Sequence, residues 1–548
     1  MRTSFVAPLE AFDLQKPKKR PSSSKSRSHP PVLLPLLLCA PLALTLCAIS
    51  AELSFATPDL TTISRAQRLL NAAEEASPVR ESFDESLLYN ASFYPEEVFE
   101  LDWSRHIKAS DILHESALHR ACVTHKNSVI LWTFGRTGQK EAHELLELVN
   151  RSDPNLLDKL RKCPDVDILV PDHLRNFGYC EDAAAYTKFL ESRMLPRWVL
   201  EVKFEDPARK RSVTYHELCP NTPMLFFNHY WEGLVDAPDW PATKPLYLMP
   251  NIEMYELDER HYWRADVILC KTAVCARYMR KWLVQEGNPR GTRVLYTRHT
   301  TTNLALAAKS DVSASESVAK NFSDVSFLHT AGKSIQKGTR QVLDCWLDRP
   351  DFPRLDFYMD QELYEGAFGD YEERISESSN VYLHTGRLSA NAFGRVIAQG
   401  RYFLCPSVME GYGHYINQAR SANAFIITTN AAPMNELITP SSGALVQART
   451  LSFGEQFMGG VSSKEHALHN ISGLVAQFER DDLCDAVVNV LKNSSAEERE
   501  LRASRALQQY YFDTVFFTHK MKELRTFARA MRHPSLRGKI RNGVSSIQ

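Results

Sequence analysis

The sequence predicts an α/β protein with two Rossmann-like domains that face each other across a cleft. The chain has 548 residues, which is too long for one ordinary domain. Short apolar runs alternate with helix-like segments over residues 126–307 and again over residues 326–480. This alternation is typical of a parallel sheet covered by helices. Residues 308–325 are rich in serine and poor in aromatic side chains, and they predict a linker between the domains.

The first 51 residues predict a targeting segment. Residues 1–30 are rich in proline, serine and basic side chains and predict a cytoplasmic tail without a fold. Residues 31–51 carry no charge, and their length lets a helix cross a hydrocarbon core of about 30 Å. Because the basic side stays cytoplasmic, we expect a type II anchor in the Golgi or endoplasmic reticulum membrane, with the rest of the chain in the lumen. A cleaved signal peptide is the alternative, since Ala48-Ile49-Ser50 is an acceptable cleavage site.

Charge and cysteine usage exclude some functions. The formal net charge of −1 gives no general attraction to nucleic acid. The 11 cysteines contain no Cys-x-x-Cys pair, and Cys270 and Cys275 are too far apart for a zinc knuckle, so a zinc site is not expected. Two cysteines lie in the apolar leader, and the nine that remain predict at least one free or intermolecular thiol. Five glycosylation triplets are compatible with a secretory route: Asn90, Asn150, Asn321, Asn470 and Asn493.

The body of the chain divides into a stem, two α/β series and a helical end. Residues 52–125 predict a stem and an irregular entry region, with one helix over 63–76. In the first series we expect strands over 128–134, 166–170, 198–202, 224–227, 246–249, 267–270 and 294–296, and helices over 139–149 and 272–285. In the second we expect strands over 326–330, 355–359, 381–383, 402–405, 425–428 and 444–446, and helices over 339–347, 391–399 and 414–423. Residues 481–548 predict a C-terminal helical tail.

A lysine-rich turn follows the first strand of the second series. It reads Gly332-Lys333-Ser334-Ile335-Gln336-Lys337-Gly338 and places two ammonium groups beside glycines at the carboxyl end of a strand. Each ammonium is a point charge with three donors, which suits a diphosphate. A solvated basic turn before a helix is the alternative interpretation.

A glycine-bearing turn follows the strand over 402–405. It reads Glu410-Gly411-Tyr412-Gly413-His414 and opens a predicted helix. A strand, a glycine turn and a helix in this order place helix N–H groups over a phosphate. The glycines let the backbone approach a ligand closely, and the Glu410 carboxylate can accept hydrogen bonds from sugar hydroxyls. A tight turn with an exposed glutamate is the alternative.

Four further features are candidates for ligand contact. Pro433 to Leu437 opens a short helix, and Glu436 there either faces the same ligand or is a first-turn carboxylate favoured by the helix dipole. Gly135-Arg136-Thr137-Gly138 is placed to close over the ligand from the first domain. His229 follows a predicted strand and either reaches a substrate or is a structural histidine. Arg387 stands where a nucleotide base often docks, and a plain loop is the alternative there.

These motifs together resemble the C-terminal domain of retaining GT-B glycosyltransferases of the family 4 type. Lys333 stands where that group usually has arginine in its G-R motif, and Lys337-Gly338 matches its K-G. Glu410 to Gly413 matches E-G-F-G, and Pro433 to Glu436 matches the Pro/Glu turn that follows. Gly135 to Gly138 looks like the glycine loop of the first domain. The resemblance is good over about residues 326–448 and weaker over 127–300.

One position departs from the family pattern. The E-x7-E motif would need glutamate at position 418, and this chain has Gln418. In the family the second glutamate is implicated in binding the nucleotide ribose. An amide can still hydrogen-bond hydroxyls, although it carries no charge and mixes donors with acceptors.

The resemblance implies a glycosyltransferase that moves a sugar from a nucleotide-diphosphate sugar to a glycan, protein or lipid acceptor, with retention of anomeric configuration. Lys333 and Lys337 would stabilise the departing diphosphate, and Glu410 would hold the donor sugar. Helix N–H groups after Gly413 would share the phosphate charge. No cofactor or metal is implied, and Asp165-Val166-Asp167 is interpreted as the entry to a buried strand. The alternatives are a catalytically degenerate lumenal binding protein and a nucleotide-sugar epimerase, both of the same fold.

Overall fold

The structure, a computed structural model, describes Tyr94 and residues 96–136, 147–228, 232–254, 257–310, 320–451 and 464–532. The chain divides into two compact units, Met1–Ile63 and Ser64–Gln548, and every described residue belongs to the second. The predicted tail, membrane anchor and helix 63–76, and residues 311–319 of the linker, lie outside the described residues. Among the helices that are described, none is long and apolar enough to cross a membrane.

The first sheet has eight strands in the order β10-β9-β8-β7-β3-β4-β1-β2. The strands are β1 (Val129–Leu131), β2 (Leu148–Val149), β3 (Asp167–Leu169), β4 (Arg193–Leu195), β7 (Met224–Phe227), β8 (Leu246–Met249), β9 (Val267–Cys270) and β10 (Arg293–Tyr296). In this sheet β10, β9, β8, β7, β3 and β4 run parallel, whereas β1 pairs antiparallel with both β2 and β4. The direction in which the sheet grows reverses between β3 and β7, which makes their carboxyl ends a topological switch point.

Two predicted elements of the first domain are wrong. The run over 198–202 is not a strand but the single helical turn α9 (Trp198–Glu201), and the strand beside it is β4, which was not predicted. A short apolar run has no period long enough to distinguish the two structures. The last two residues of the predicted helix over 139–149 form the strand β2 instead. Residues 139–146 of that prediction lie outside the described residues.

Helices cover the first sheet, and two described helices, α4 (Glu97–Glu100) and α5 (Ala109–Thr124), come from the predicted stem. Leu118 and Ala121 of α5 join the buried core of this sheet. Besides α9, the other described α-helices up to residue 310 are α7 (Leu156–Arg161), α8 (Phe177–Phe189), α10 (Tyr215–Leu218), α11 (Glu232–Val235), α12 (Glu259–Arg264), α13 (Ala273–Glu286) and α14 (Leu304–Ser310). Of these, α14 packs on the second domain through Ala305. The predicted irregular entry region therefore contributes an integral helix, because its apolar side chains fit the uncovered face of the sheet.

The second sheet has six parallel strands in the order β13-β12-β11-β14-β15-β16. They are β11 (Phe327–Gly332), β12 (Leu355–Met359), β13 (Val381–Thr385), β14 (Tyr402–Cys405), β15 (Phe425–Thr429) and β16 (Ala444–Val446). All six predicted strands of this series are confirmed. Numbered along the chain, the order is that of the Rossmann fold, with its switch point between β11 and β14. The helices are α15 (Thr339–Leu347), α16 (Gln361–Ala367), α17 (Glu372–Glu377), α18 (Ala390–Gln399), α19 (His414–Ser421) and α20 (Met434–Leu437).

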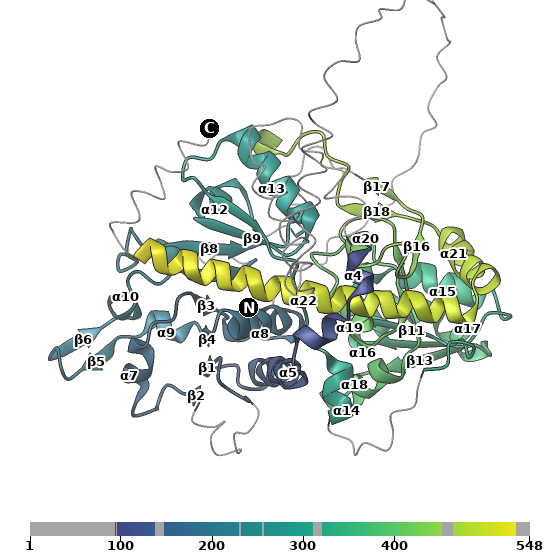
Figure 1. Ribbon diagram of the computed structural model, residues 1–548, viewed down its shortest axis with the longest axis horizontal. Coiled ribbons are helices and arrows are strands. Elements are labelled where there is room, and N and C mark those ends of the chain that lie inside the picture. The colour runs from purple at the N-terminus through teal and green to yellow at the C-terminus, as the bar shows by residue number, and fades with distance from the viewer. Residues whose placement is uncertain are drawn as a thin grey trace, which may run out of the picture. The chain divides into compact units, whose positions relative to one another are not determined.

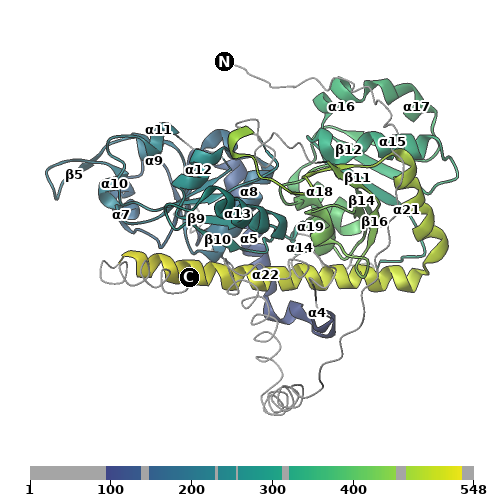
Figure 2. The same cartoon turned by 90° about the horizontal axis from the view of Figure 1, so that it is seen from above.

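The predicted helical tail is part of both domains. Helix α21 (Arg480–Asn493) packs on the second sheet, and α22 (Ala496–Arg532) is 37 residues long. Figures 1 and 2 show α22, in yellow, running along both α/β domains. Near its start Ala503 joins the core of the second sheet, and further along Phe517 and Met521 join the core of the first. The two domains are therefore joined by a shared helix.

Four disulfides cross-link the described residues. They join Cys122 to Cys180, Cys163 to Cys219, Cys270 to Cys275, and Cys345 to Cys484. Cys405 remains as a buried free thiol in this part of the chain, as the odd cysteine count predicted.

Candidate functional site

Two loops meet at the switch point of the second sheet, where β11 and β14 are neighbours. Lys337 ends the 3-10 turn Ile335–Lys337 after β11, and Glu410 lies between β14 and α19. The Lys337 ammonium donates a hydrogen bond to Oε1 of Glu410. The two side chains are only 15% and 10% exposed, so the pair is mostly shielded from water. The structure thus brings together two of the three residues that were predicted to be catalytic.

Gly338 explains how the two loops come so close. It has a φ of 67°, and a Cβ at this position would lie 2.1 Å from the carbonyl oxygen of Pro406. No side chain fits there. The loops are also joined through their backbones, since the N–H of Val408 donates to the carbonyl of Gln336 at 2.9 Å. In the Lys-Gly motif the lysine supplies charge, and the glycine lets its loop reach the Glu410 loop.

Ser407 and Tyr415 complete the surroundings of the Lys337–Glu410 pair. Ser407 Oγ donates to Oε1 of Glu410 at 2.5 Å, and the hydroxyl of Tyr415 lies 2.5 Å from the same Oγ. The Lys337 Nζ lies 4.1 Å from the centroid of the Tyr415 ring, in a cation–π contact. These contacts orient both the carboxylate and the ammonium.

Lys333 does not join this pair. Its side chain is 73% exposed, and its Nζ lies 3.2 Å from Oδ2 of Asp360, which follows β12. Gly332, which precedes it, is also exposed. Both residues lie at the same edge of the sheet as Glu410, because β11, β12 and β14 are parallel. An exposed ion pair contributes little stability, so this ammonium can turn toward an anionic ligand at small cost.

The rest of the Glu410 loop faces the first domain. A Cβ on Gly411 would lie 2.6 Å from Oε1 of Glu253 and 2.7 Å from Oδ1 of Asn251, which both follow β8. Tyr412 is buried, and its hydroxyl donates to the carbonyl of His299. The Tyr412 side chain therefore lies in the contact between the domains, because its ring is packed there, and not on a surface that faces a ligand.

Gly413 and α19 continue this contact. Gly413 has a φ of 103° and precedes the first residue of the helix, His414. His414 Nε2 lies 3.3 Å from Oδ1 of Asp182, and Gln418 Nε2 donates to Oε1 of Glu181 at 3.0 Å. Both carboxylates belong to α8 of the first domain. The residue predicted to contact a nucleotide ribose is therefore bound to a carboxylate of the other domain.

Glu436 binds the first domain as well. Its two carboxylate oxygens accept hydrogen bonds from the N–H groups of Ala273 and Val274, at 2.7 and 2.8 Å, at the start of α13. A carboxylate is stabilised at a helix N-terminus by the helix dipole, and here the helix belongs to the other domain. Burial of the carboxyl raises the pKa of Glu436 to about 7, although these two N–H groups, Arg277 and Arg298 lower it.

We expect the stability of the protein to reflect the titration of Glu436. Its carboxyl ordinarily titrates near pH 4.5 and in the folded protein near pH 7, so folding takes up a proton between these values. The stabilising contribution of this group is complete below pH 4.5 and is lost as the pH rises to 7. Glu436→Gln removes this titration. In urea unfolding at several pH values, the variant should gain stability relative to the wild type across this range. A difference between the two proteins that does not change with pH would contradict the expectation.

One predicted residue of the first domain does not reach this site, and two others lie outside the described residues. Gly135 follows β1, which is antiparallel to β4. Its loop therefore leaves the sheet at the amino ends of the parallel strands, opposite to the edge that contacts Gly411, and the predicted role of Gly135 over the ligand is wrong. Gly138 and His229 lie outside the described residues.

Arg387 contacts the other domain from the loop after β13. It is exposed, and its guanidinium lies 4.6 Å from the ring centroid of Phe177 at the start of α8. The place of Arg387 next to a nucleotide base stays a prediction.

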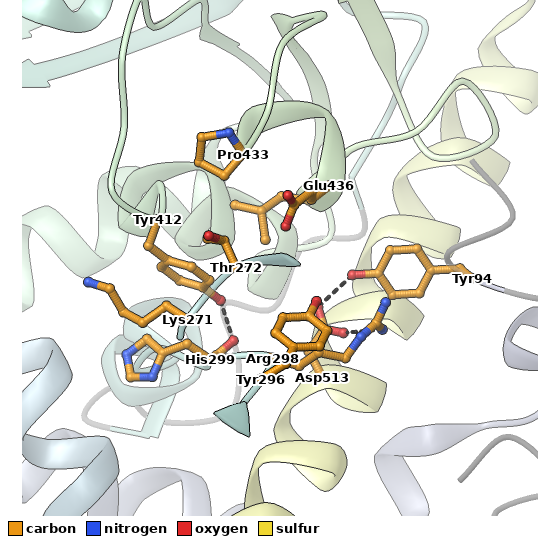
Figure 3. Close-up of a pocket in the computed structure, with 11 residues that line it drawn as sticks. Tyr94, Lys271, Thr272, Tyr296, Arg298, His299, Tyr412, Pro433, Glu436 and Asp513 are labelled. Atoms are coloured by element: carbon orange, nitrogen blue, oxygen red, sulfur yellow. Dashed lines mark hydrogen bonds and ion pairs between the residues drawn. The ribbon is translucent and has the colours of Figure 1, made fainter. Parts of the chain in front are cut away.

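A buried charge network joins both domains through α22. Asp513 binds Arg298 of the first domain at 2.8 Å and Arg420 of the second at 2.7 Å, and the hydroxyl of Tyr94 donates to it at 2.7 Å. All four side chains are buried. Figure 3 shows three of them beside Glu436 around a cavity of about 10 Å³. This cavity holds about one water molecule and is too small for a nucleotide sugar.

A cluster with metal-binding side chains lies in the same contact. Asp182, His299 and His414 have potential ligand atoms within 4.8 Å of one another. Lys271 Nζ, however, lies 3.2 Å from both Asp182 oxygens. Burial raises the pKa of Asp182, but Lys271 and His414 outweigh it and hold that pKa well below its usual value. The carboxylate is thus already matched by an ammonium, which would repel a divalent cation.

Sequence comparisons give no match to a protein-family model or to a curated protein. Among solved structures, the chain is similar to an α,α-trehalose 6-phosphate synthase from Burkholderia multivorans, at 9% identity and a TM-score of 0.41, over 60% of this chain and 73% of that chain. It is also similar to a sucrose-phosphate synthase from Thermosynechococcus elongatus, at 11% identity and a TM-score of 0.42, over 66% of this chain and 97% of that chain. A pneumococcal O-GlcNAc transferase in complex with UDP and GlcNAc matches at 12% identity and a TM-score of 0.38, over 57% of either chain. This chain thus spans less than two thirds of the pneumococcal transferase.

Several residues of the contact were not predicted, although the sequence carries a signal for some of them. Glu181 and Asp182 interrupt an otherwise apolar run, from Cys180 through Ala183-Ala184-Ala185 to Tyr186. Two carboxylates inside such a helix predict buried polar partners, because buried charges are paired. Lys271 directly follows a predicted strand and offers the same kind of signal. Ser407 and Tyr415 have no such signal in the sequence, because their role depends on where the Lys337 loop lies.

Proposed function

We propose that the chain is a glycosyltransferase that takes its sugar from a nucleoside-diphosphate sugar. The observation that carries the proposal is the Lys337–Glu410 pair at the switch point of a Rossmann-type sheet. Ligands of such sheets bind at that point, outside the carboxyl ends of the strands. An ammonium there suits a diphosphate, and a carboxylate suits sugar hydroxyls. The loop after β8 of the first domain approaches Gly411 from the other side, which supports a ligand held between the two domains.

Each residue has a definite task in this reaction. The bond between the anomeric carbon and the diphosphate breaks, and its electron pair leaves on the diphosphate as negative charge. The anomeric carbon forms a bond to the acceptor oxygen, whose proton passes to the departing diphosphate. Lys337 would stabilise the negative charge on the diphosphate, together with Lys333 after it turns away from Asp360. As the diphosphate draws Lys337 toward itself, a lone pair of Glu410 becomes available to a hydroxyl of the donor sugar. Ser407 holds the same carboxylate in place.

The finer features of the reaction are part of the proposal. Retention of anomeric configuration is supported by the resemblance of the Lys337-Gly338 and Glu410 to Gly413 motifs to retaining enzymes. The acceptor is a glycan, a protein or a lipid, and no cofactor or metal takes part.

Donor turnover is the test of this proposal. The purified chain is incubated with a panel of common nucleotide sugars, with and without glycan acceptors, and the released nucleoside diphosphate is measured. We expect one donor to raise the thermal midpoint with the logarithm of its concentration and to be turned over with an acceptor. Glycan binding without turnover of any donor would identify a binding protein instead. A free sugar isomer released without an acceptor would identify an epimerase.

We also propose that this part of the chain works in the lumen of the endoplasmic reticulum or Golgi, anchored by residues 31–51. Its four disulfides support an oxidising compartment, where such bonds persist. The asparagines of the four glycosylation triplets in the described residues are exposed: Asn150, Asn321, Asn470 and Asn493. Treatment of the protein from eukaryotic cells with an N-glycosidase should increase its electrophoretic mobility, and an unchanged mobility would contradict this location.

A further inference from the structure

Glu181 and Asp182 are adjacent carboxylates buried in the contact between the domains. Each residue is 2% exposed. They lie on α8, which follows β3 at the switch point of the first sheet. Buried carboxylates are tolerated only where charged or hydrogen-bonding partners compensate for the water they lose. The partners of these two carboxylates therefore show which groups this surface of the first domain binds.

Glu181 is held by both domains. In the first domain it accepts hydrogen bonds from the N–H and the hydroxyl of Thr302, both at 2.9 Å. From the second domain it accepts the amide hydrogen of Gln418 at 3.0 Å. Its neighbour Asp182 accepts from Lys271 at 3.2 Å and meets His414 of the second domain at 3.3 Å.

Both contacts from the second domain come from one face of α19. His414 and Gln418 are one helical turn apart, so their side chains point the same way. The same helix begins directly after Gly413, at the end of the loop that carries Glu410. The position of α19 relative to α8 therefore also sets the position of the Glu410 loop relative to the first domain.

We propose that Glu181 is a positioning residue, which fixes α19 and the Glu410 loop against the first domain through the amide of Gln418. Glutamine is the residue this pairing requires, because its NH₂ group donates to a carboxylate that also accepts from Thr302. A glutamate at position 418 would place a second carboxylate at about the 3.0 Å that now separates the Gln418 amide from Glu181. Two like charges at that distance in a buried site repel strongly, and one must take up a proton. The catalytic consequence rests on the proposed function, whereas the pairing does not.

A charge-swap cycle tests the pairing. It compares Gln418→Glu, Glu181→Gln and the double variant Glu181→Gln/Gln418→Glu, in which the amide and the carboxylate have exchanged places. Gln418→Glu should lower the thermal midpoint by at least about 4 °C, and the double variant should recover most of that loss. Gln361→Glu is a matched control, because Gln361 donates to Oε1 of Glu365 at 2.8 Å in an exposed pair. There water screens the repulsion, and we expect a shift of less than about 1 °C.

Transfer kinetics give the second measurement. If α19 is misplaced in Gln418→Glu, kcat should fall about tenfold or more, and the swap should restore it. Rescue by the swap separates positioning from a merely structural role, since a lost packing contact would not return when the charges are exchanged. Rescue of the thermal midpoint without transfer by any variant supports the pairing and counts against the transferase. Transfer by the wild type without rescue overturns the pairing and leaves the transferase intact. An increase in donor affinity on Gln418→Glu alone would also overturn it.

Discussion

Lys337→Ala is expected to reduce sugar transfer by about 10²–10³-fold, because it removes the cation proposed to meet the charge that develops on the diphosphate. The structure adds an effect on stability. The Lys337 and Glu410 side chains are only 15% and 10% exposed, so the variant leaves a largely buried carboxylate without its ammonium. Ser407 still donates to this carboxylate, and we expect the loss in free energy of unfolding to be about 1–3 kcal/mol. Turnover of the donor and urea unfolding of the same preparation measure the two effects.

Two further variants separate charge from stability. The double variant Lys337→Ala/Glu410→Gln removes both charges and should recover most of the stability while remaining inactive, since an apolar or neutral pair leaves no isolated charge. Lys333→Ala changes an exposed lysine, 73% accessible, and should leave stability within about 0.5 kcal/mol of the wild type. Near-normal transfer by Lys337→Ala would show that the diphosphate binds elsewhere.

Asp513→Ala is expected to cause the largest loss of stability, about 3–5 kcal/mol. Asp513 binds the guanidinium of Arg298 at 2.8 Å and that of Arg420 at 2.7 Å, and all three side chains are buried. The variant leaves two buried guanidinium groups in the contact between the domains without the carboxylate that both of them bind. Because the arginines belong to different domains, the contact between the domains should weaken. Limited proteolysis should therefore cut between the domains faster in the variant than in the wild type.

A partly exposed ion pair on the same helix provides the control. Arg502 and Glu498 lie one turn apart on α22, with side chains 29% and 42% exposed. Glu498→Ala should cost no more than about 0.5 kcal/mol, because water screens such pairs. Asp513→Asn keeps the shape of the side chain and removes its charge. Its loss in free energy of unfolding should lie between those of Asp513→Ala and Glu498→Ala. Equal losses for Asp513→Ala and Glu498→Ala would contradict the role of the buried network.

The fold of the second domain could be predicted from the sequence almost completely. Two of its strands, Tyr402–Cys405 and Phe425–Thr429, are buried at every position, and such runs are typical of a parallel sheet covered on both faces. The first domain was harder for the same physical reason. The strand Arg193–Leu195 carries a charged side chain, whereas the neighbouring apolar turn at Trp198 is helical. In both segments the local composition predicts a different structure from the one that tertiary packing produces.

The residues of the candidate site also divide into those that local sequence features predict and those that they do not. Lys337, Gly338 and Glu410 were found because strand ends and glycine turns are local features of the sequence. The roles of Gln418 and Glu436 could not be found, because their partners lie 237 and 162–163 residues away along the chain, in the other domain. The error at Gly135 arose because the direction of the strand before it depends on its pairing with β4.

The sequence by itself determined the α/β class, the strands of the second sheet and the two loops that carry Lys337 and Glu410. These features follow from hydrophobic periodicity and turn chemistry, which act over a few residues. Only the tertiary structure decided which charges are buried together: Asp513 with two arginines, Glu181 with Gln418, and Glu436 with the start of α13. The reason is physical, because a charge can enter the interior only where folding brings its partner from elsewhere in the chain.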